Sequence, residues 1–349
     1  MKKLLLIMLA ILTFSCKEDE KVVDNTKDEW LLLAAADDGA LKLVQIPEGK
    51  ILSEDIYKQV NGVSLEAPAR KIAFFRNTIY LLMPDVFKIE VIDSRDYKHI
   101  ATIDFSAEQL IPSDICFPPN ATSAYICHGN DSIVSIVDIK NGFVISRKIQ
   151  CGMNPVSIAC SQDTILGNQI ITANKGDNTS TVIDTRDNKA AATLKIGIAP
   201  LFAKTTPDGK RFIVICAGAG KVDSLTGKSA AEAYLIDIES RGIIAKKDVG
   251  FGIVNAIDQI PQGVAITLKN WAFIPTDKAL LKYETRFGQQ IAVVSQLPHK
   301  YALYNIYRDQ LLLLRNDGAG SIISVANNST GKEEQSIKLP IKIIAIQPL

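Results

Sequence analysis

One short apolar phrase that ends in aspartate recurs four times along this chain. The copies end at Asp93, Asp138, Asp184 and Asp237, so that successive copies lie 45, 46 and 53 residues apart. Each copy is followed by turn residues and a second strand-like run, as at 190–196. A repeat of about 45 residues built from short strands is typical of a β-propeller, in which each repeat forms one blade.

Seven such units can be counted over residues 30–349, at about 46 residues for each unit. The units are 30–77, 78–122, 123–168, 169–210, 211–263, 264–309 and 310–349. We therefore expect an all-β, seven-bladed β-propeller with four-stranded blades. This expectation replaces the two domains that a length of 349 residues would suggest by itself.

The two ends of the repeat region predict how the ring closes. Residues 30–34 stand at a second-strand position of their unit, and residues 341–346 stand at a first-strand position. We expect the C-terminal strand to pair with the N-terminal strand in a shared blade, because this pairing removes two exposed sheet edges.

The N-terminus has the pattern of an export signal. Two lysines precede nine apolar residues at 4–12, which are far fewer than the roughly 20 that span a bilayer. The segment ends in Thr13-Phe14-Ser15-Cys16, which resembles the lipobox of bacterial lipoproteins. The resemblance implies a signal peptide at 1–15 and a lipidated Cys16 that begins a charged linker at 16–29. The alternative is an ordinary secreted protein with a free Cys16.

A charged stretch, Lys17-Glu18-Asp19-Glu20, follows the lipobox directly. It resembles the acidic tag that exports some lipoproteins to the outer face of the outer membrane. The resemblance implies a lipid-anchored protein of the outer membrane that faces the cell exterior. The alternative is a plain hydrated linker between anchor and domain.

Composition and motifs exclude several classes of function. The chain has 39 Lys and Arg against 38 Asp and Glu. A nucleic-acid-binding protein usually carries an excess of basic residues, and this balance gives no sign of one. Three histidines make a multi-histidine metal centre unexpected, and the motifs HExxH, GxSxG and GxGxxG do not occur. We therefore expect no enzymatic activity, no cofactor and no metal.

Five cysteines remain after Cys16, and no two have the CxxC spacing of zinc or redox motifs. Most stand in apolar, strand-like stretches, where a buried cysteine acts as a small hydrophobic residue. The sequence leaves their disulfide state open. They are Cys116, Cys127, Cys151, Cys160 and Cys216.

Loops on one face of a propeller surround its central funnel, and ligands often bind there. These are the loops between second and third strands and the connections between blades. Aromatic side chains mixed with polar ones in these loops predict a concave ligand site, although ordinary loop composition would explain them too. The candidate binding residues are Phe87, His128, Asn130, Asn174, Lys175, Trp271, Tyr301 and Arg315. For His128, a hydrogen-bonded role is favoured over metal ligation.

Two segments resemble known families. Residues 180–216, with the turn Pro207-Asp208-Gly209-Lys210, resemble the YVTN-type β-propeller repeat. Residues 51–93 resemble BtuG-type surface lipoproteins, which are seven-bladed propellers that capture corrinoids and pass them to a TonB-dependent transporter. The chain departs from that family's binding rim at 34–39 and 83–87, so no binding residue can be transferred.

These observations predict a surface-exposed lipoprotein that captures a scarce ligand, such as a corrinoid, and passes it to a TonB-dependent outer-membrane transporter. Its partners would be that transporter, a small molecule and the membrane. The alternative is a non-catalytic propeller for protein–protein interaction or adhesion at the cell surface. An enzyme would need carboxylates or histidines that converge in the funnel, and the repeat shows none.

Overall fold

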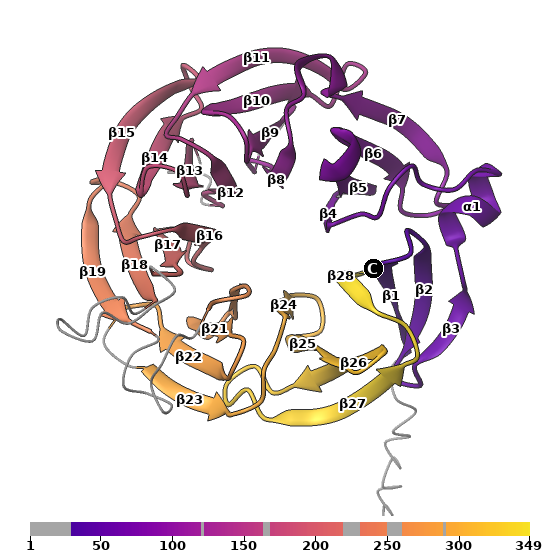
Figure 1. The fold of residues 1–349 in the computed structure, drawn as a ribbon. Coiled ribbons are helices and arrows are strands. Elements are labelled where there is room, and N and C mark those ends of the chain that lie inside the picture. Colours follow the sequence, from indigo (N-terminus) through magenta and orange to yellow (C-terminus); the bar gives the residue numbers. More distant parts are fainter. Residues whose placement is uncertain (1–28, 120–121, 163–167, 219–230, 250–259, 289–290) are drawn as a thin grey trace, which may run out of the picture.

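The chain folds into a closed ring of seven antiparallel sheets (Figure 1). This structure is a computed structural model, and it describes residues 29–119, 122–162, 168–218, 231–249, 260–288 and 291–349. Each sheet has four strands, which confirms the expected seven-bladed propeller. The expected signal peptide, Cys16 and the acidic tag lie outside the described residues and stay predictions.

In six blades the strands follow chain order from the channel outward, and in the closing blade the last strand of the chain, β28, is innermost. The blade that holds both chain ends consists of β28 (Ile343–Pro348), β1 (Trp30–Ala36), β2 (Leu41–Ile46) and β3 (Lys50–Ser53). The next two are β4 (Lys71–Phe75), β5 (Thr78–Met83), β6 (Lys88–Asp93) and β7 (His99–Asp104), then β8 (Pro112–Cys116), β9 (Ser123–His128), β10 (Ile133–Asp138) and β11 (Val144–Gln150).

The remaining four blades continue around the ring. Two are β12 (Pro155–Cys160), β13 (Gln169–Asn174), β14 (Thr179–Asp184) and β15 (Lys189–Lys195), then β16 (Pro200–Thr205), β17 (Arg211–Cys216), β18 (Glu232–Asp237) and β19 (Ile243–Asp248). The last two are β20 (Ala265–Ile266), β21 (Trp271–Pro275), β22 (Leu280–Glu284) and β23 (Ile291–Ser295), then β24 (Tyr301–Asn305), β25 (Gln310–Asp317), β26 (Gly320–Ala326) and β27 (Glu333–Leu339). Short helices α1 (Ile56–Asn61), η1 (Pro84–Val86) and η2 (Ser106–Glu108) lie in connections.

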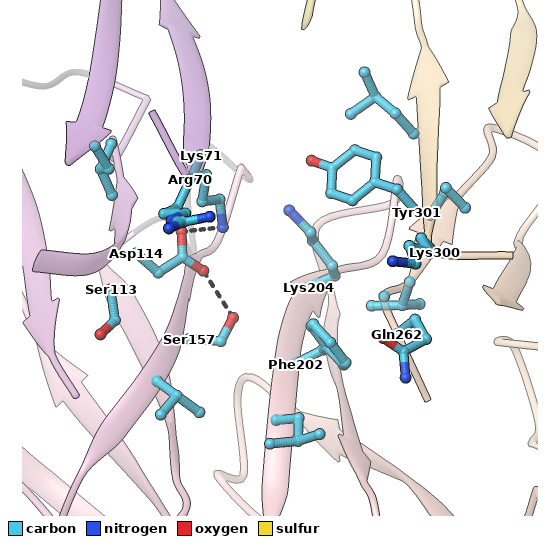
Figure 2. A pocket seen from close by; sticks show the side chains of 18 of the residues that line it. Arg70, Lys71, Ser113, Asp114, Ser157, Phe202, Lys204, Gln262, Lys300 and Tyr301 are labelled. Carbon is cyan, nitrogen blue, oxygen red and sulfur yellow. Dashed lines mark hydrogen bonds and ion pairs between the residues drawn. The ribbon is translucent and has the colours of Figure 1, made fainter. Parts of the chain in front are cut away.

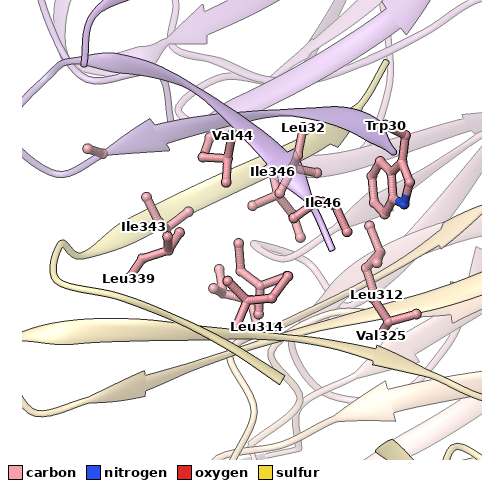
Figure 3. Packing of buried hydrophobic residues seen from close by; sticks show 14 residues of the cluster. Trp30, Leu32, Val44, Ile46, Leu312, Leu314, Val325, Leu339, Ile343 and Ile346 are labelled. Carbon is pink, nitrogen blue, oxygen red and sulfur yellow. The ribbon is translucent and has the colours of Figure 1, made fainter. Parts of the chain in front are cut away.

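The ring closes through the first blade, as the repeat phase predicts. Strand β28 pairs antiparallel with β1, and Ala34 lies opposite Ile346 in the register. Ile343 and Ile346 are buried with Leu32 in an apolar cluster that also includes residues of β25 and β26 (Figure 3). This cluster therefore joins the closing blade to the last blade of the chain.

Burial explains the apolar phrase of the repeat. The middle strands of each blade are packed by neighbouring blades on both faces, so nearly all their residues are buried, as in β13 and β17. A strand that is buried on both faces is apolar throughout instead of alternating. The outermost strands, such as β15, keep mostly exposed residues.

The recurring aspartates have a structural role, as their positions before turns indicate. In each case Oδ1 accepts a hydrogen bond from a backbone N–H of the following turn, at 2.8–3.0 Å. A carboxylate that bonds its own turn in this way fixes the hairpin between the third and fourth strands. The four are Asp93, Asp138, Asp184 and Asp237.

The expected boundary of the sixth unit was wrong. Six of the seven units begin where a second strand begins, as at Ser123 and Gln310, but the unit that starts at 264 begins beside a first strand, β20. The second strand of that blade starts later, at Trp271. The spacing of this blade differs because 16 residues separate the end of β19 from the start of β20, whereas four separate β15 from β16.

Candidate ligand-binding channel

The innermost strands of the blades surround a cavity of about 530 Å³ on the propeller axis, which we call the channel cavity. Its wall includes residues from β4, β8, β12, β16, β20, β24 and β28. Six side chains define its chemistry (Figure 2). They are Lys71, Asp114, Ser157, Phe202, Lys204 and Tyr301.

A polar network runs along one side of this wall. Nζ of Lys71 forms an ion pair with Oδ1 of Asp114, and the Ser157 hydroxyl donates to Oδ2 of Asp114 at 2.7 Å. The Ser157 oxygen in turn accepts a hydrogen bond of 3.1 Å from the backbone N–H of Ala203. The network thus connects β4, β8, β12 and β16, which belong to four consecutive blades.

The ion pair sets the charge of both of its members. Burial, the largest single effect, would raise the pKa of Asp114, but the charges of Lys71 and Lys204 and the hydrogen bonds from Lys71 and Ser157 together hold this pKa below its usual value. Burial likewise disfavours the charged form of Lys71, and the Asp114 carboxylate reverses the effect, so the pKa of Lys71 is raised. Both groups therefore stay ionised at neutral pH.

Lys204 lies across the cavity from this pair, and its amine points into the channel (Figure 2). Within the described part of the chain its Nζ has no hydrogen-bond or ion-pair partner. The side chain is exposed to solvent within the channel, but the protein around the channel and the nearby charge of Lys71 still lower the pKa of Lys204, and Asp114 offsets this only in part. Of the three lysines that line the cavity, Lys71 is ion-paired, and Lys204 and Lys300 form no ion pair with the described residues.

Aromatic and aliphatic groups form the other side of the cavity. Phe202 and Tyr301 are half-buried, and both lie on the wall with Leu303 and Ile344. Burial raises the pKa of Tyr301, so its hydroxyl is protonated at neutral pH and is able to donate. The site thus combines apolar contact surface with a few polar groups, which is the usual composition of a small-molecule pocket.

The predicted rim residues divide between the two faces of the ring. The rim face carries the loops between second and third strands and the connections between blades. Phe87, His128, Asn130, Asn174, Lys175 and Arg315 lie at the ends of such strands or in such loops. Among the predicted residues, only Tyr301 also lines the channel cavity.

Two of these rim residues are fully buried. His128 is 0% exposed, and its Nε2 lies 2.8 Å from the Ser135 hydroxyl. Burial lowers the pKa of His128 to about 4, so the ring is neutral at pH 7. Asn174 is also 0% exposed, and its amide donates to the hydroxyls of Thr179 and Thr181 at 2.9 and 3.0 Å. Both side chains hold loop bases in place and are covered from solvent.

The other rim residues are more accessible. Asn130 is exposed, and its side chain bonds the backbone of Ile111 and Gln109. Lys175 is exposed. Phe87 is half-buried against apolar residues, and the guanidinium of Arg315 lies 3.6 Å from the Glu333 carboxylate.

Trp271 does not lie in a loop between second and third strands, so its expected position was wrong. It begins β21 directly after the loop between first and second strands, which is on the face opposite the rim. Nζ of Lys282 lies 3.6 Å from the centre of its ring. The cause is the shifted sixth unit described above.

The wall residues Lys71, Asp114, Ser157 and Lys204 were not selected from the sequence. A signal for two of them exists, because several inner strands begin with proline, a residue tolerated at the first position of a strand. The residue two positions after Pro112 is Asp114, and the residue two positions after Pro155 is Ser157. Aligning the repeats on these prolines would have placed both side chains at the axis.

In the described ranges, no group of three or more His, Cys, Asp or Glu side chains is arranged to hold a metal ion. Cys116, Cys127, Cys151, Cys160 and Cys216 are free thiols, and burial raises the pKa of Cys216 to about 12. No helix among the described residues is long and apolar enough to cross a membrane.

Comparison with known proteins supports the fold alone. No protein-family model matches the chain, and no curated protein matches it in sequence. A solved structure named Kuenenia stuttgartiensis hydrazine synthase is similar, with a TM-score of 0.61 and 16% sequence identity. The match covers 76% of this chain and 79% of that one. At this identity the activity in that name belongs to that protein, and the YVTN and BtuG resemblances stay predictions.

Proposed function

We propose that this protein binds a small molecule in the channel cavity and at its rim, without catalysis. The observation that carries the proposal is the wall itself, where the amine of Lys204, which forms no ion pair with the described residues, projects into the channel beside the apolar surface of Phe202 (Figure 2). A cavity of about 530 Å³ is within the range that encloses drug-sized ligands.

The polar groups of the wall favour binding over catalysis. A nucleophilic serine needs a general base that removes its proton. Ser157 donates to Asp114, and this carboxylate already forms an ion pair with Lys71. No histidine is among the residues that line the cavity. We therefore propose that the network fixes the shape of the wall.

In the more specific form of the proposal, the protein is a surface lipoprotein that passes its ligand to a TonB-dependent transporter. Support comes from the lipobox-like segment at Cys16, the acidic stretch after it, and the resemblance to BtuG-type proteins. A corrinoid with its nucleotide loop is larger than the drug-sized ligands that such cavities enclose. Only part of it would enter the channel, and the rest would lie across the rim.

A ligand panel with a blocked cavity tests the binding proposal. Cobalamin, cobinamide, haem and a siderophore would be titrated by calorimetry into the wild-type protein and Val156→Trp, which fills the channel from β12. Val144→Trp, at a position 59% exposed on β11, is the matched control. We expect binding that Val156→Trp abolishes and Val144→Trp preserves. Binding that is unaffected by Val156→Trp would contradict the channel as the site.

The proposed location has a separate test in the native host. Cys16→Ala should release the protein from the membrane, because the acyl chains supply the anchoring energy. Replacing residues 17–20 by alanine should keep the anchor but remove accessibility to external protease. Persistent accessibility would leave the charged stretch as a spacer only.

One observation favours a second function, protein–protein interaction on the face opposite the rim. Loops of two adjacent blades expose large apolar side chains there, and Phe287 and Tyr307 are 70% and 81% exposed. Exposed apolar groups that cluster are common at interaction sites. The test is whether the double variant Phe287→Ser with Tyr307→Ser loses binding of a native partner protein. If it does, and no small molecule binds in the channel, protein–protein interaction replaces ligand binding as the proposed function.

A further inference from the structure

We infer that the channel cavity recognises the anionic end of its ligand, a phosphate or a carboxylate, and that Lys204 is the residue that binds it. This inference rests on the proposed function and adds the chemical class of the ligand. It starts from the charges that line the cavity.

The cavity wall has four basic side chains and one acidic side chain. Arg70 is neutralised by Asp85, which accepts from its guanidinium at 2.8 Å, and Lys71 is neutralised by Asp114. Lys204 and Lys300 remain. Both side chains are exposed. Lys300 directly precedes β24 on the rim side, and Lys204 lies further along the channel on β16.

Asp114 has no acceptor capacity left for Lys204. Its Oδ1 accepts from Nζ of Lys71 and from the backbone N–H of Ile115, and its Oδ2 accepts from the Ser157 hydroxyl and the N–H of Ile158. A carboxylate has about four lone-pair sites, and all four are used. The carboxylate of Asp114 therefore makes its hydrogen bonds within the wall and forms no direct ion pair with Lys204, although its charge offsets part of the shift in the pKa of Lys204.

An anion would supply what Lys204 lacks. The Lys204 side chain is exposed to solvent within the channel, and both the surrounding protein and the charge of Lys71 disfavour its ammonium form and lower its pKa. A bound phosphate or carboxylate would pair with the ammonium and would raise the pKa of Lys204. The Tyr301 hydroxyl also points into the cavity and could donate a second hydrogen bond (Figure 2).

The rest of the wall selects the other end of the ligand. Phe202, Val264, Ile266 and Leu303 line the cavity with apolar surface. A ligand with one anionic group and a compact apolar or aromatic body would therefore match both sides. Charge and burial together give such a molecule an advantage over a neutral one of the same shape.

Three probes of one shape test this inference: 1-naphthyl phosphate, 1-naphthoate and the neutral 1-naphthol. Each would be titrated by calorimetry into the wild-type protein, Lys204→Met, and the control Lys195→Met, which removes an exposed lysine of the outer strand β15. We expect at least one anion to bind about tenfold more tightly than 1-naphthol, which corresponds to about 1.4 kcal/mol. Lys204→Met should abolish this preference, and Lys195→Met should keep it.

The outcomes separate the inference from the function on which it rests. Equal binding of all three probes to the wild-type protein would overturn the anion subsite and leave small-molecule capture intact. An anion preference that survives Lys204→Met would overturn the assignment of Lys204. No binding of any probe would count against both. A comparison of 1-naphthyl phosphate with 1-naphthoate shows which anion the site favours.

A measurement on the wild-type protein removes the dependence on a variant that folds. Binding of 1-naphthoate would be measured at pH 8, 9 and 10, a range that approaches the ordinary pKa of a lysine, and at each pH in two buffers with different ionisation enthalpies. Because the anion stabilises the protonated amine of Lys204, we expect net proton uptake on binding. The absence of proton uptake, with tight binding of the anion, would contradict a subsite at Lys204.

Discussion

The Ser157 hydroxyl donates a 2.7 Å hydrogen bond to Oδ2 of Asp114, although the two residues are 43 positions apart in the chain. Each lies on the innermost strand of its own blade, and the blades are neighbours. The bond therefore joins two repeats at the axis of the ring. The stability of the ring and the shape of the ligand cavity consequently depend on the same side chains.

Ser157→Ala should lower the free energy of unfolding by about 1–3 kcal/mol, because it leaves a buried acceptor and a buried donor without this partner. The affected groups are the Asp114 carboxylate and the backbone N–H of Ala203. Urea denaturation measures the loss. Ser123→Ala, at the start of β9, is the control and should change stability by about 0.5 kcal/mol or less. Equal losses in both variants would contradict a role for the bond.

Asp114→Asn should cost about 3 kcal/mol, since it leaves the Lys71 ammonium unpaired in the channel wall. The Lys71 side chain is 26% exposed, which places the cost at the low end for a broken ion pair. The double variant Lys71→Met with Asp114→Leu should recover much of the loss because no charge is left unpaired. If the double variant loses as much free energy of unfolding as Lys71→Met and Asp114→Leu lose together, the two side chains are not coupled, and the role of the ion pair is contradicted.

Ile346→Asp should abolish cooperative folding or lower the melting temperature sharply. Ile346 is 0% exposed in the pairing of β28 with β1, so the variant buries an unpaired charge where the ring closes. The matched variant Ile244→Asp, at a position 50% exposed on β19, should have little effect. Deletion of residues 340–349 should act as Ile346→Asp does. Unchanged thermal unfolding after that deletion would contradict closure through this blade.

The buried His128 predicts a loss of stability in mild acid. Burial lowers its folded-state pKa to about 4, whereas the ordinary pKa in the unfolded chain is 6.5. The unfolded chain therefore binds more protons, and the stabilisation is complete above pH 6.5 and is lost as the pH falls toward 4. Between pH 7 and pH 5 this residue should contribute a loss of about 2 kcal/mol.

The matched measurement is urea denaturation of the wild-type protein and His128→Gln at both pH values. The variant should be less stable at pH 7 but should lose less stability between pH 7 and pH 5. A wild-type slope that His128→Gln does not change would contradict the lowered pKa.

The fold could be predicted because each repeat has its own signal. The apolar phrase before each turn aspartate reflects a strand buried on both faces, and Asp138 and Asp184 bond their turns as that position suggests. Ring closure followed from the phase of the two chain ends. The strands of the sixth blade were misplaced, because only the regular spacing of the repeat indicated where they begin. The second strand of this blade begins at Trp271, later than that spacing predicts.

The channel cavity could not be found in the same way. Rim residues were chosen for their chemistry and loop position, but sequence does not show which loop-base residues are covered, as His128 and Asn174 are. The wall forms from single residues of separate repeats that meet only when the ring closes. Lys71, Asp114 and Lys204 lie in short strands whose other residues are mostly apolar, so the sequence of each strand indicates only a place in the core.

The most direct test of the channel as a ligand site is a crystal structure of the protein with 1-naphthyl phosphate. We expect the phosphate within hydrogen-bond distance of Nζ of Lys204 and the naphthalene ring against Phe202. A probe that binds in solution but is ordered on the opposite face near Phe287 and Tyr307, with only water in the channel, would contradict the proposed site.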